Sequence, residues 1–76
     1  MEYDVSLDCR GLSCPMPILK ASKKIKELEV GQVLEVLADD PGGEEDFPAW
    51  CEQTGNEFLG QEEEEDYLKF YIRKKA

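Results

Sequence analysis

The sequence contains no histidine, and none of its apolar runs is longer than three residues. A membrane-spanning helix needs roughly 20 consecutive apolar residues, so the sequence predicts none. The absence of histidine excludes Cys–His nucleophile pairs and zinc sites that use histidine ligands. The chain has 76 residues, of which 41% are apolar, and this is enough for one small two-layer core. We therefore predict a single domain over residues 1–76.

Cysteine is scarce and odd in number, with Cys9, Cys14 and Cys51 as the three positions. The N-terminal residues have neither the basic segment nor the apolar segment of a secretion signal. We therefore expect free thiols in a reducing compartment, the cytoplasm, and no disulfide scaffold. Three thiolates would need a fourth ligand from elsewhere to hold zinc, and the C-x4-C spacing is wide for a zinc knuckle. No metal site is predicted.

Basic residues are absent from the middle of the chain. Residues 27–66 hold fifteen Asp and Glu residues and no Lys or Arg, whereas residues 1–26 and 67–76 are net positive, and the whole chain carries a charge of −9. A surface of this charge repels nucleic acid, so direct binding to nucleic acid is not predicted. A local basic patch remains open as an alternative, and its candidate residues are Lys20, Lys23, Lys24, Arg73, Lys74 and Lys75.

Hydrophobic periodicity predicts six elements in the order βαβαββ. The predicted strands lie at about residues 3–8, 32–38, from 57 onward and 67–73, and the predicted helices at about 15–28 and 44–54. Pro48 indicates that the second helix becomes regular nearer Asp46, and residues 62–66 are expected to form an exposed hairpin turn. The crossover between the first two long strands requires a parallel pair. The predicted fold is an α/β (α+β) two-layer sandwich, with two helices on one face of a mixed four-stranded sheet.

The thiol of Cys14, just before the first predicted helix, is the main candidate for chemistry. Proline lacks an N–H and is tolerated where a helix leaves N–H groups unpaired, so Pro15 and Pro17 predict that Cys14 is the N-cap residue. The partial positive charge of a helix N-terminus favours a thiolate. Sulfur-to-sulfur exchange needs only a populated thiolate, whereas acyl chemistry would need a base. The alternative of a buried, structural Cys14 is opposed by the turn and the prolines.

The other two cysteines are expected to be structural. Cys51 lies on the apolar side of the second predicted helix, and Cys9 ends the first strand in step with its apolar residues. Because resolving cysteines lie beside reactive ones, a resolving role for Cys9 stays open. The pair Asp39-Asp40 precedes Pro-Gly and is explained by turn chemistry.

The segment Leu7–Pro17, LDCRGLSCPMP, resembles the signature of the TusA/SirA-like sulfur-carrier family, which includes the YedF group. The resemblance continues through Ala38-Asp39-Asp40-Pro41 and into Ile72-Arg73-Lys74. The resemblance implies a persulfide site and supporting residues at Cys14, Pro15, Pro17, Asp8, Gly11, Asp39 and Asp40.

The resemblance implies a βαβαββ fold like that of the C-terminal domain of translation initiation factor 3. It also implies that Cys14 accepts sulfur as a persulfide and passes it to a partner protein, and no cofactor is predicted. The implied donor is a cysteine desulfurase or a rhodanese. The implied acceptors serve tRNA thiolation, molybdenum-cofactor synthesis, sulfur oxidation or selenium metabolism. Relatives often carry a basic residue where this chain has Glu44-Glu45-Asp46, and local charge of this kind steers encounters between proteins.

The sequence therefore predicts a cytoplasmic sulfur carrier with a persulfide on Cys14. Nothing else in the sequence supplies catalytic groups, so a stand-alone turnover enzyme is not predicted. Two alternatives stay open. One is a regulatory or binding module that contacts RNA or protein through the basic helix and tail, and the other is a thiol redox switch that joins Cys9 and Cys14.

Overall fold

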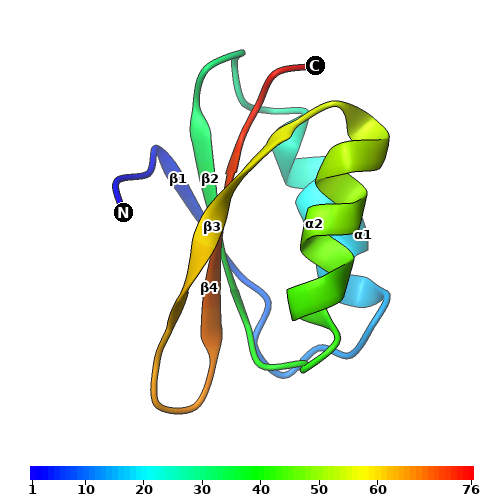
Figure 1. The fold of residues 1–76 in the computed structure, drawn as a ribbon, viewed down its shortest axis with the longest axis vertical. Coiled ribbons are helices and arrows are strands. Elements are labelled where there is room, and N and C mark those ends of the chain that lie inside the picture. Colours follow the sequence, from blue (N-terminus) through cyan, green and yellow to red (C-terminus); the bar gives the residue numbers. More distant parts are fainter.

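The computed structural model describes residues 1–76 and has the predicted elements in the order βαβαββ (Figure 1). They are β1 (Val5–Asp8), α1 (Met16–Ile25), β2 (Val33–Ala38), α2 (Gly43–Thr54), β3 (Glu57–Glu63) and β4 (Leu68–Arg73). The strands form one sheet in the order β1-β2-β4-β3, in which β1 and β2 are parallel and the other two pairings are antiparallel. Both helices lie on the same side of this sheet, which confirms the predicted two-layer sandwich.

The loops that follow the two parallel strands lie at the same end of the molecule. β1 and β2 run in the same direction, and each leads through a loop into a helix, so both helices begin at this end (Figure 1). The turn between β3 and β4 lies there as well. Segments that are far apart in the sequence thus meet beyond the carboxyl ends of the parallel strands, where α/β folds commonly place their sites.

The core lies between the sheet and the two helices. The helices bury the faces that the sequence predicts, which include Ala21, Ile25, Phe47, Trp50 and Cys51. These side chains pack against the helix-facing side of β2 and β4. Phe47 stacks on Phe70 with the ring centroids 4.6 Å apart. Burial of one side chain of this size contributes roughly 1.5–3 kcal/mol to folding, so this layer holds α2 against the sheet.

The opposite face of the sheet buries a carboxylate that the sequence analysis did not anticipate. Glu35 in β2 is 5% exposed, and its register partner on β4, Tyr71, is 1% exposed. The Glu35 carboxylate accepts hydrogen bonds from the hydroxyls of Tyr71 at 2.9 Å and Ser6 at 2.6 Å. Burial raises the pKa of Tyr71, and so do the hydrogen bonds from its hydroxyl to the carboxylates of Glu35 and Glu62. The helix-free face is therefore held by hydrogen bonds between side chains, which offset the cost of burying a polar group.

The first helix begins one residue later than predicted. Its N-cap is Pro15, whose carbonyl accepts the N–H of Leu19 at 3.0 Å. Cys14 therefore lies just before the helix, and the prediction that it is the N-cap is wrong. The reason lies in the preceding turn, where the N–H of Met16 donates to the carbonyl of Ser13 at 2.9 Å, so the chain is still turning at Cys14.

The ends of α1 and β3 also differ from the prediction. α1 ends at Ile25, because the N–H of Leu28 donates to the carbonyl only three residues back, and a tighter turn replaces the last predicted helical turn. β3 extends to Glu63, so the predicted turn at residues 62–66 is shorter than expected. A register shift between Phe58 and Gly60 lets this longer strand stay paired with β4.

The second helix begins at Gly43, earlier than the regular start near Asp46 that Pro48 indicated. Acidic side chains in its first turn suit the positive end of the helix dipole and favour the early start. Pro48 removes one helical hydrogen bond without ending the helix. Neither helix of the fold has the length and apolar character that a membrane span requires.

Candidate functional site

Cys14 is the exposed cysteine of the chain. Cys9 and Cys51 are 0% and 1% exposed and belong to the core, which confirms their predicted packing. Burial raises the pKa of the Cys9 thiol and raises that of Cys51 to about 12, so both stay protonated. Reaction of a sulfur with a molecule from solution is therefore centred on Cys14.

The loop between β1 and α1 is held by hydrogen bonds at its first residues. The Asp8 carboxylate accepts the backbone N–H and the guanidinium of Arg10, each at 3.0 Å, and these bonds lower the pKa of Asp8 to about 2. The Arg10 guanidinium also lies 4.8 Å from the ring centroid of Tyr67. Gly11 adopts a φ of +84°, which glycine tolerates without strain, and its N–H donates to the Asp39 carboxylate at 3.0 Å. The loop after β1 is thus tied to the loop after β2.

Asp40 orients the backbone of Cys14. Its Oδ2 accepts the Cys14 N–H at 2.7 Å, and its Oδ1 accepts the Gly42 N–H at 3.3 Å. One carboxylate therefore bridges the loop before α1 and the loop before α2. Turn chemistry alone, which the sequence analysis assigned to Asp39-Asp40, does not describe this role.

The start of α1 offers the sulfur few backbone donors. Pro15 and Pro17 have no N–H, and the N–H of Met16 between them is used by the carbonyl of Ser13. The direct hydrogen bonds through which a helix N-terminus would stabilise a Cys14 thiolate are therefore missing from these three residues.

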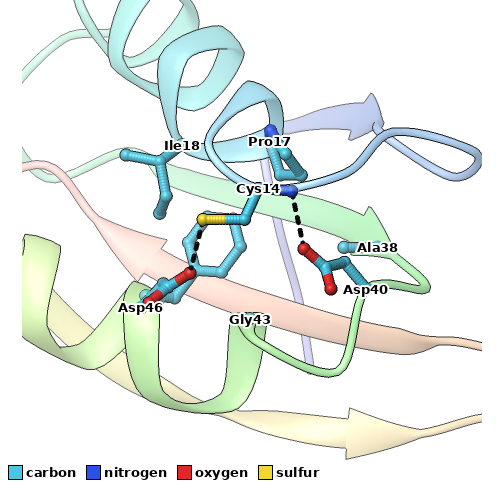
Figure 2. Close-up of a pocket in the computed structure, with 8 residues that line it drawn as sticks. Cys14, Pro17, Ile18, Ala38, Asp40, Gly43 and Asp46 are labelled. Carbon is cyan, nitrogen blue, oxygen red and sulfur yellow. Dashed lines mark hydrogen bonds between the residues drawn. The ribbon is translucent and has the colours of Figure 1, made fainter.

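The thiol of Cys14 points toward α2 (Figure 2). Its Sγ donates a hydrogen bond to Oδ2 of Asp46 in the first turn of α2, at 3.2 Å. This hydrogen bond is the main reason why the pKa of Cys14 is raised, and partial desolvation and the negative charges of Asp46 and Asp40 act in the same direction. The prediction of a thiolate favoured by the helix terminus is therefore wrong. A full carboxylate charge in contact with the sulfur outweighs the roughly half-unit charge of a helix end.

A small hollow opens beside the sulfur. Figure 2 shows its lining residues, which are Cys14, Pro17, Ile18, Ala38, Asp40, Gly43, Asp46 and Phe47. A Cβ added at Gly43 would lie 3.0 Å from the Phe70 ring, so the close approach of α2 to β4 leaves little room for a side chain there. The hollow has apolar side chains beside two carboxylates, and it leaves the sulfur open to a reactant from solution.

Asp46 and Gly43 are the site residues that the sequence analysis missed. Asp46 belongs to the acidic run Glu44-Glu45-Asp46, and this run alone does not indicate that Asp46 lies beside Cys14. The predicted parallel pairing of the first two strands does indicate such a contact. Parallel strands that each lead into a helix bring the two helix starts together, so the acidic first turn of one helix is a neighbour of the cysteine before the other.

The basic tail lies at the other end of the molecule from the helix starts (Figure 1). Arg73 and Lys75 pair with Glu57 at 3.3 and 3.8 Å, and the Lys74 ammonium donates to the carbonyl of Leu28 at 2.7 Å. The tail cations therefore hold the C-terminal segment in place, away from the Cys14 loop. No three acidic or cysteine side chains of the fold are grouped so that they could hold a metal ion.

Fold and site together define a class, that of small βαβαββ domains with one exposed thiol in the loop before the first helix. Residues 5–74 match the model of the family described as sulfurtransferase TusA. The chain belongs to this family, which confirms the resemblance seen in the sequence.

Individual relatives agree with the family assignment. The chain is 47% identical over 73 residues to the sulfur carrier protein TusA of Allochromatium vinosum, and the match covers 96% of each chain. YrkF of Bacillus subtilis is 46% identical over 74 residues, which make up 97% of this chain and 40% of that protein. The solved structure of a SirA-like protein from Desulfitobacterium hafniense superimposes with a TM-score of 0.78 at 28% identity, covering 96% of this chain and 100% of the other.

Proposed function

We propose that this protein is a sulfur carrier that takes up sulfur as a persulfide on Cys14 and passes it to an acceptor protein. Membership of the TusA family supports the carrier role, since a relative of nearly equal length is named a sulfur carrier protein. The observation that carries the assignment to Cys14 is its exposure, because the other two thiols are buried in the core. The supporting residues that shape or hold its loop are Pro15, Pro17, Asp8, Gly11, Asp39 and Asp40.

The proposed transfer needs no oxidant and no cofactor. During uptake, the Cys14 thiol gives its proton to water, and its sulfur attacks the terminal sulfur of a donor persulfide, R–S–SH. A new S–S bond forms at Cys14 while the S–S bond of the donor breaks, and the donor sulfur leaves with the electron pair and takes up a proton. Cys14 then carries –S–SH, and the donor is a thiol. Delivery repeats the exchange with the acceptor as nucleophile and the Cys14 sulfur as leaving group.

The proposal requires two protein partners, one that donates sulfur and one that accepts it. A cysteine desulfurase or a rhodanese suits the donor role, because either presents the transferable sulfur on a cysteine. The three free cysteines support a reducing compartment, and we place the reaction in the cytoplasm. Redox pairing of Cys9 with Cys14 is not favoured, because Cys9 is fully buried and the Cys14 thiol is directed to Asp46.

Intact-mass measurement tests the proposal. Incubated with a cysteine desulfurase and free cysteine, the protein should gain the mass of one sulfur atom, and dithiothreitol should remove it. Cys14→Ser should abolish this gain, because it removes the exposed thiol. Cys51→Ser is the matched control, since it removes a buried thiol, and it should gain sulfur as the wild type does.

The same measurement separates the carrier from its alternatives. Gain of sulfur by Cys14→Ser at the wild-type level would show that the assignment to Cys14 is wrong. If neither a cysteine desulfurase nor a rhodanese loads the protein, and the protein instead binds RNA in a salt-sensitive way, the binding module would replace the carrier.

A further inference from the structure

The charged groups that act on the Cys14 thiol are negative. They are Asp46 of α2 and Asp40 of the loop before α2. Oδ2 of Asp46 is 3.2 Å from Sγ, and Oδ2 of Asp40 is 2.7 Å from the Cys14 nitrogen. Both carboxylates line the hollow beside the sulfur (Figure 2). A reactant that reaches Sγ must therefore approach two negative charges.

The negative region continues beyond Asp40. A second hollow, between the loop before α2 and the β3–β4 turn, shares Asp40 with the first. Its other acidic lining residues are Asp39, Glu44, Glu63, Glu64, Glu65 and Asp66. Two cations beside this second hollow are already paired, Arg10 with Asp8 at 3.0 Å and Lys69 with Glu64 at 3.4 Å. This side of the molecule therefore repels anions from Cys14 and attracts cations.

We propose that Asp46 determines which sulfur donors Cys14 accepts: it favours a protein whose persulfide arrives beside a lysine or arginine side chain, and it disfavours small anionic persulfides. The inference rests on the proposed function, because it concerns the uptake step. A cation that pairs with Asp46 replaces the thiol as the hydrogen-bond donor to that carboxylate and removes the repulsion that opposes the thiolate. Without such a partner, Cys14 stays a protonated thiol, the form that reacts slowly with oxidants and electrophiles.

Two methanethiosulfonate reagents of similar size and opposite charge, the ethylammonium and the ethylsulfonate compounds, measure this preference. With either reagent the Cys14 thiolate attacks the divalent sulfur, forms a mixed disulfide and releases methanesulfinate. Because both react with the same thiolate, the ratio of their rates does not depend on the thiolate fraction and reports the electrostatic field at Sγ. We expect the wild-type ratio of cationic to anionic rate to exceed that of 2-mercaptoethanol, a neutral thiol.

Asp46→Asn should lower this ratio by about 25-fold, because a unit charge about 4 Å away in water changes each rate about fivefold and acts in opposite directions on the two reagents. It should also shift the pH profile of Cys14 alkylation by iodoacetamide to lower pH, because the group that raises the pKa of the thiol is removed. Uptake of sulfur from glutathione persulfide, a small anionic donor, should become faster. Glu45→Gln is the matched control: it changes the net charge equally at an exposed neighbouring position and should leave both the ratio and the profile unchanged.

An equal ratio in Asp46→Asn and Glu45→Gln would overturn the inference, and so would a wild-type ratio equal to that of 2-mercaptoethanol. If circular dichroism shows that Asp46→Asn does not fold, the salt dependence of the wild-type ratio tests the inference instead. Raising the salt concentration to about 0.5 M should bring this ratio toward that of 2-mercaptoethanol, and a salt-independent ratio would contradict the inference. These rates need no sulfur donor, so failure of persulfide loading counts against the proposed function, whereas an unchanged ratio counts against the role of Asp46.

Discussion

Three carboxylates act on the segment around Cys14, each at a different atom. Asp39 accepts a hydrogen bond from the Gly11 N–H, Asp40 accepts one from the Cys14 N–H, and Asp46 accepts one from the Cys14 thiol. The first two fix the path of the backbone, and the third raises the pKa of the thiol. Because the pKa of Cys14 is raised, its thiolate is scarce at neutral pH, and the thiolate fraction grows only as the pH approaches this raised pKa. The resting protein therefore holds an exposed thiol in its less reactive form.

Cys9 offers a test of the redox-switch alternative at the residue scale. Cys9→Ala removes a fully buried sulfur and should lower the free energy of unfolding by about 1 kcal/mol, measured by urea unfolding. Persulfide loading at Cys14 should stay at the wild-type level. In the wild type, diamide should not produce one Cys9–Cys14 disulfide per molecule, because burial protects Cys9 and raises its pKa. Stoichiometric formation of that disulfide, found by peptide mapping, would restore the switch.

At the scale of the elements, periodicity predicts the order of strands and helices and the buried faces of both helices. Local interactions move the boundaries of the helices. The hydrogen bond from the Met16 N–H to the Ser13 carbonyl delays the start of α1, and the acidic side chains in the first turn of α2 favour its early start at Gly43. The one-residue delay of α1 places Cys14 outside the helix, and the hydrogen bond to Asp46 is the main cause of its raised pKa. The sequence thus singles out the cysteine that the structure exposes, but it predicts the wrong direction of the pKa shift, because the contact with Asp46 depends on how the two helices pack against the sheet.

Gly43 tests the packing of α2 at the element scale. A Cβ at this position would lie 3.0 Å from the Phe70 ring, and overpacking of this kind costs about 1–3 kcal/mol. Alanine returns up to about 1 kcal/mol of helix propensity, so Gly43→Ala should lower the free energy of unfolding by about 1 kcal/mol in urea. Gly42→Ala is the comparison, since its nearest neighbour is the flexible Asp46 carboxylate at 3.3 Å, and it should cost less. Equal or greater stability of Gly43→Ala would contradict the packing argument.

At the scale of the whole molecule, the two ends differ. Both helix starts lie at one end, and the C-terminal segment lies at the other (Figure 1). The first end also holds Cys14 and the acidic hollows, and the basic tail at the second end contacts Glu57 and Leu28. The charge of the central segment can be counted in the sequence, but its placement around Cys14 follows from the parallel pairing of β1 and β2. The burial of Glu35 was equally hidden, because its hydroxyl partners come from two other strands.

The most direct test of the carrier account follows sulfur into the protein and out again. The protein is loaded by a cysteine desulfurase from cysteine labelled with radioactive sulfur, freed from the donor, mapped by peptide mass spectrometry and then treated with cyanide. The account predicts that the label is on the peptide that contains Cys14, and that cyanide removes it as thiocyanate and restores the unlabelled mass of the protein. Label on the peptides of Cys9 or Cys51, or label that cyanide does not release, would contradict the account.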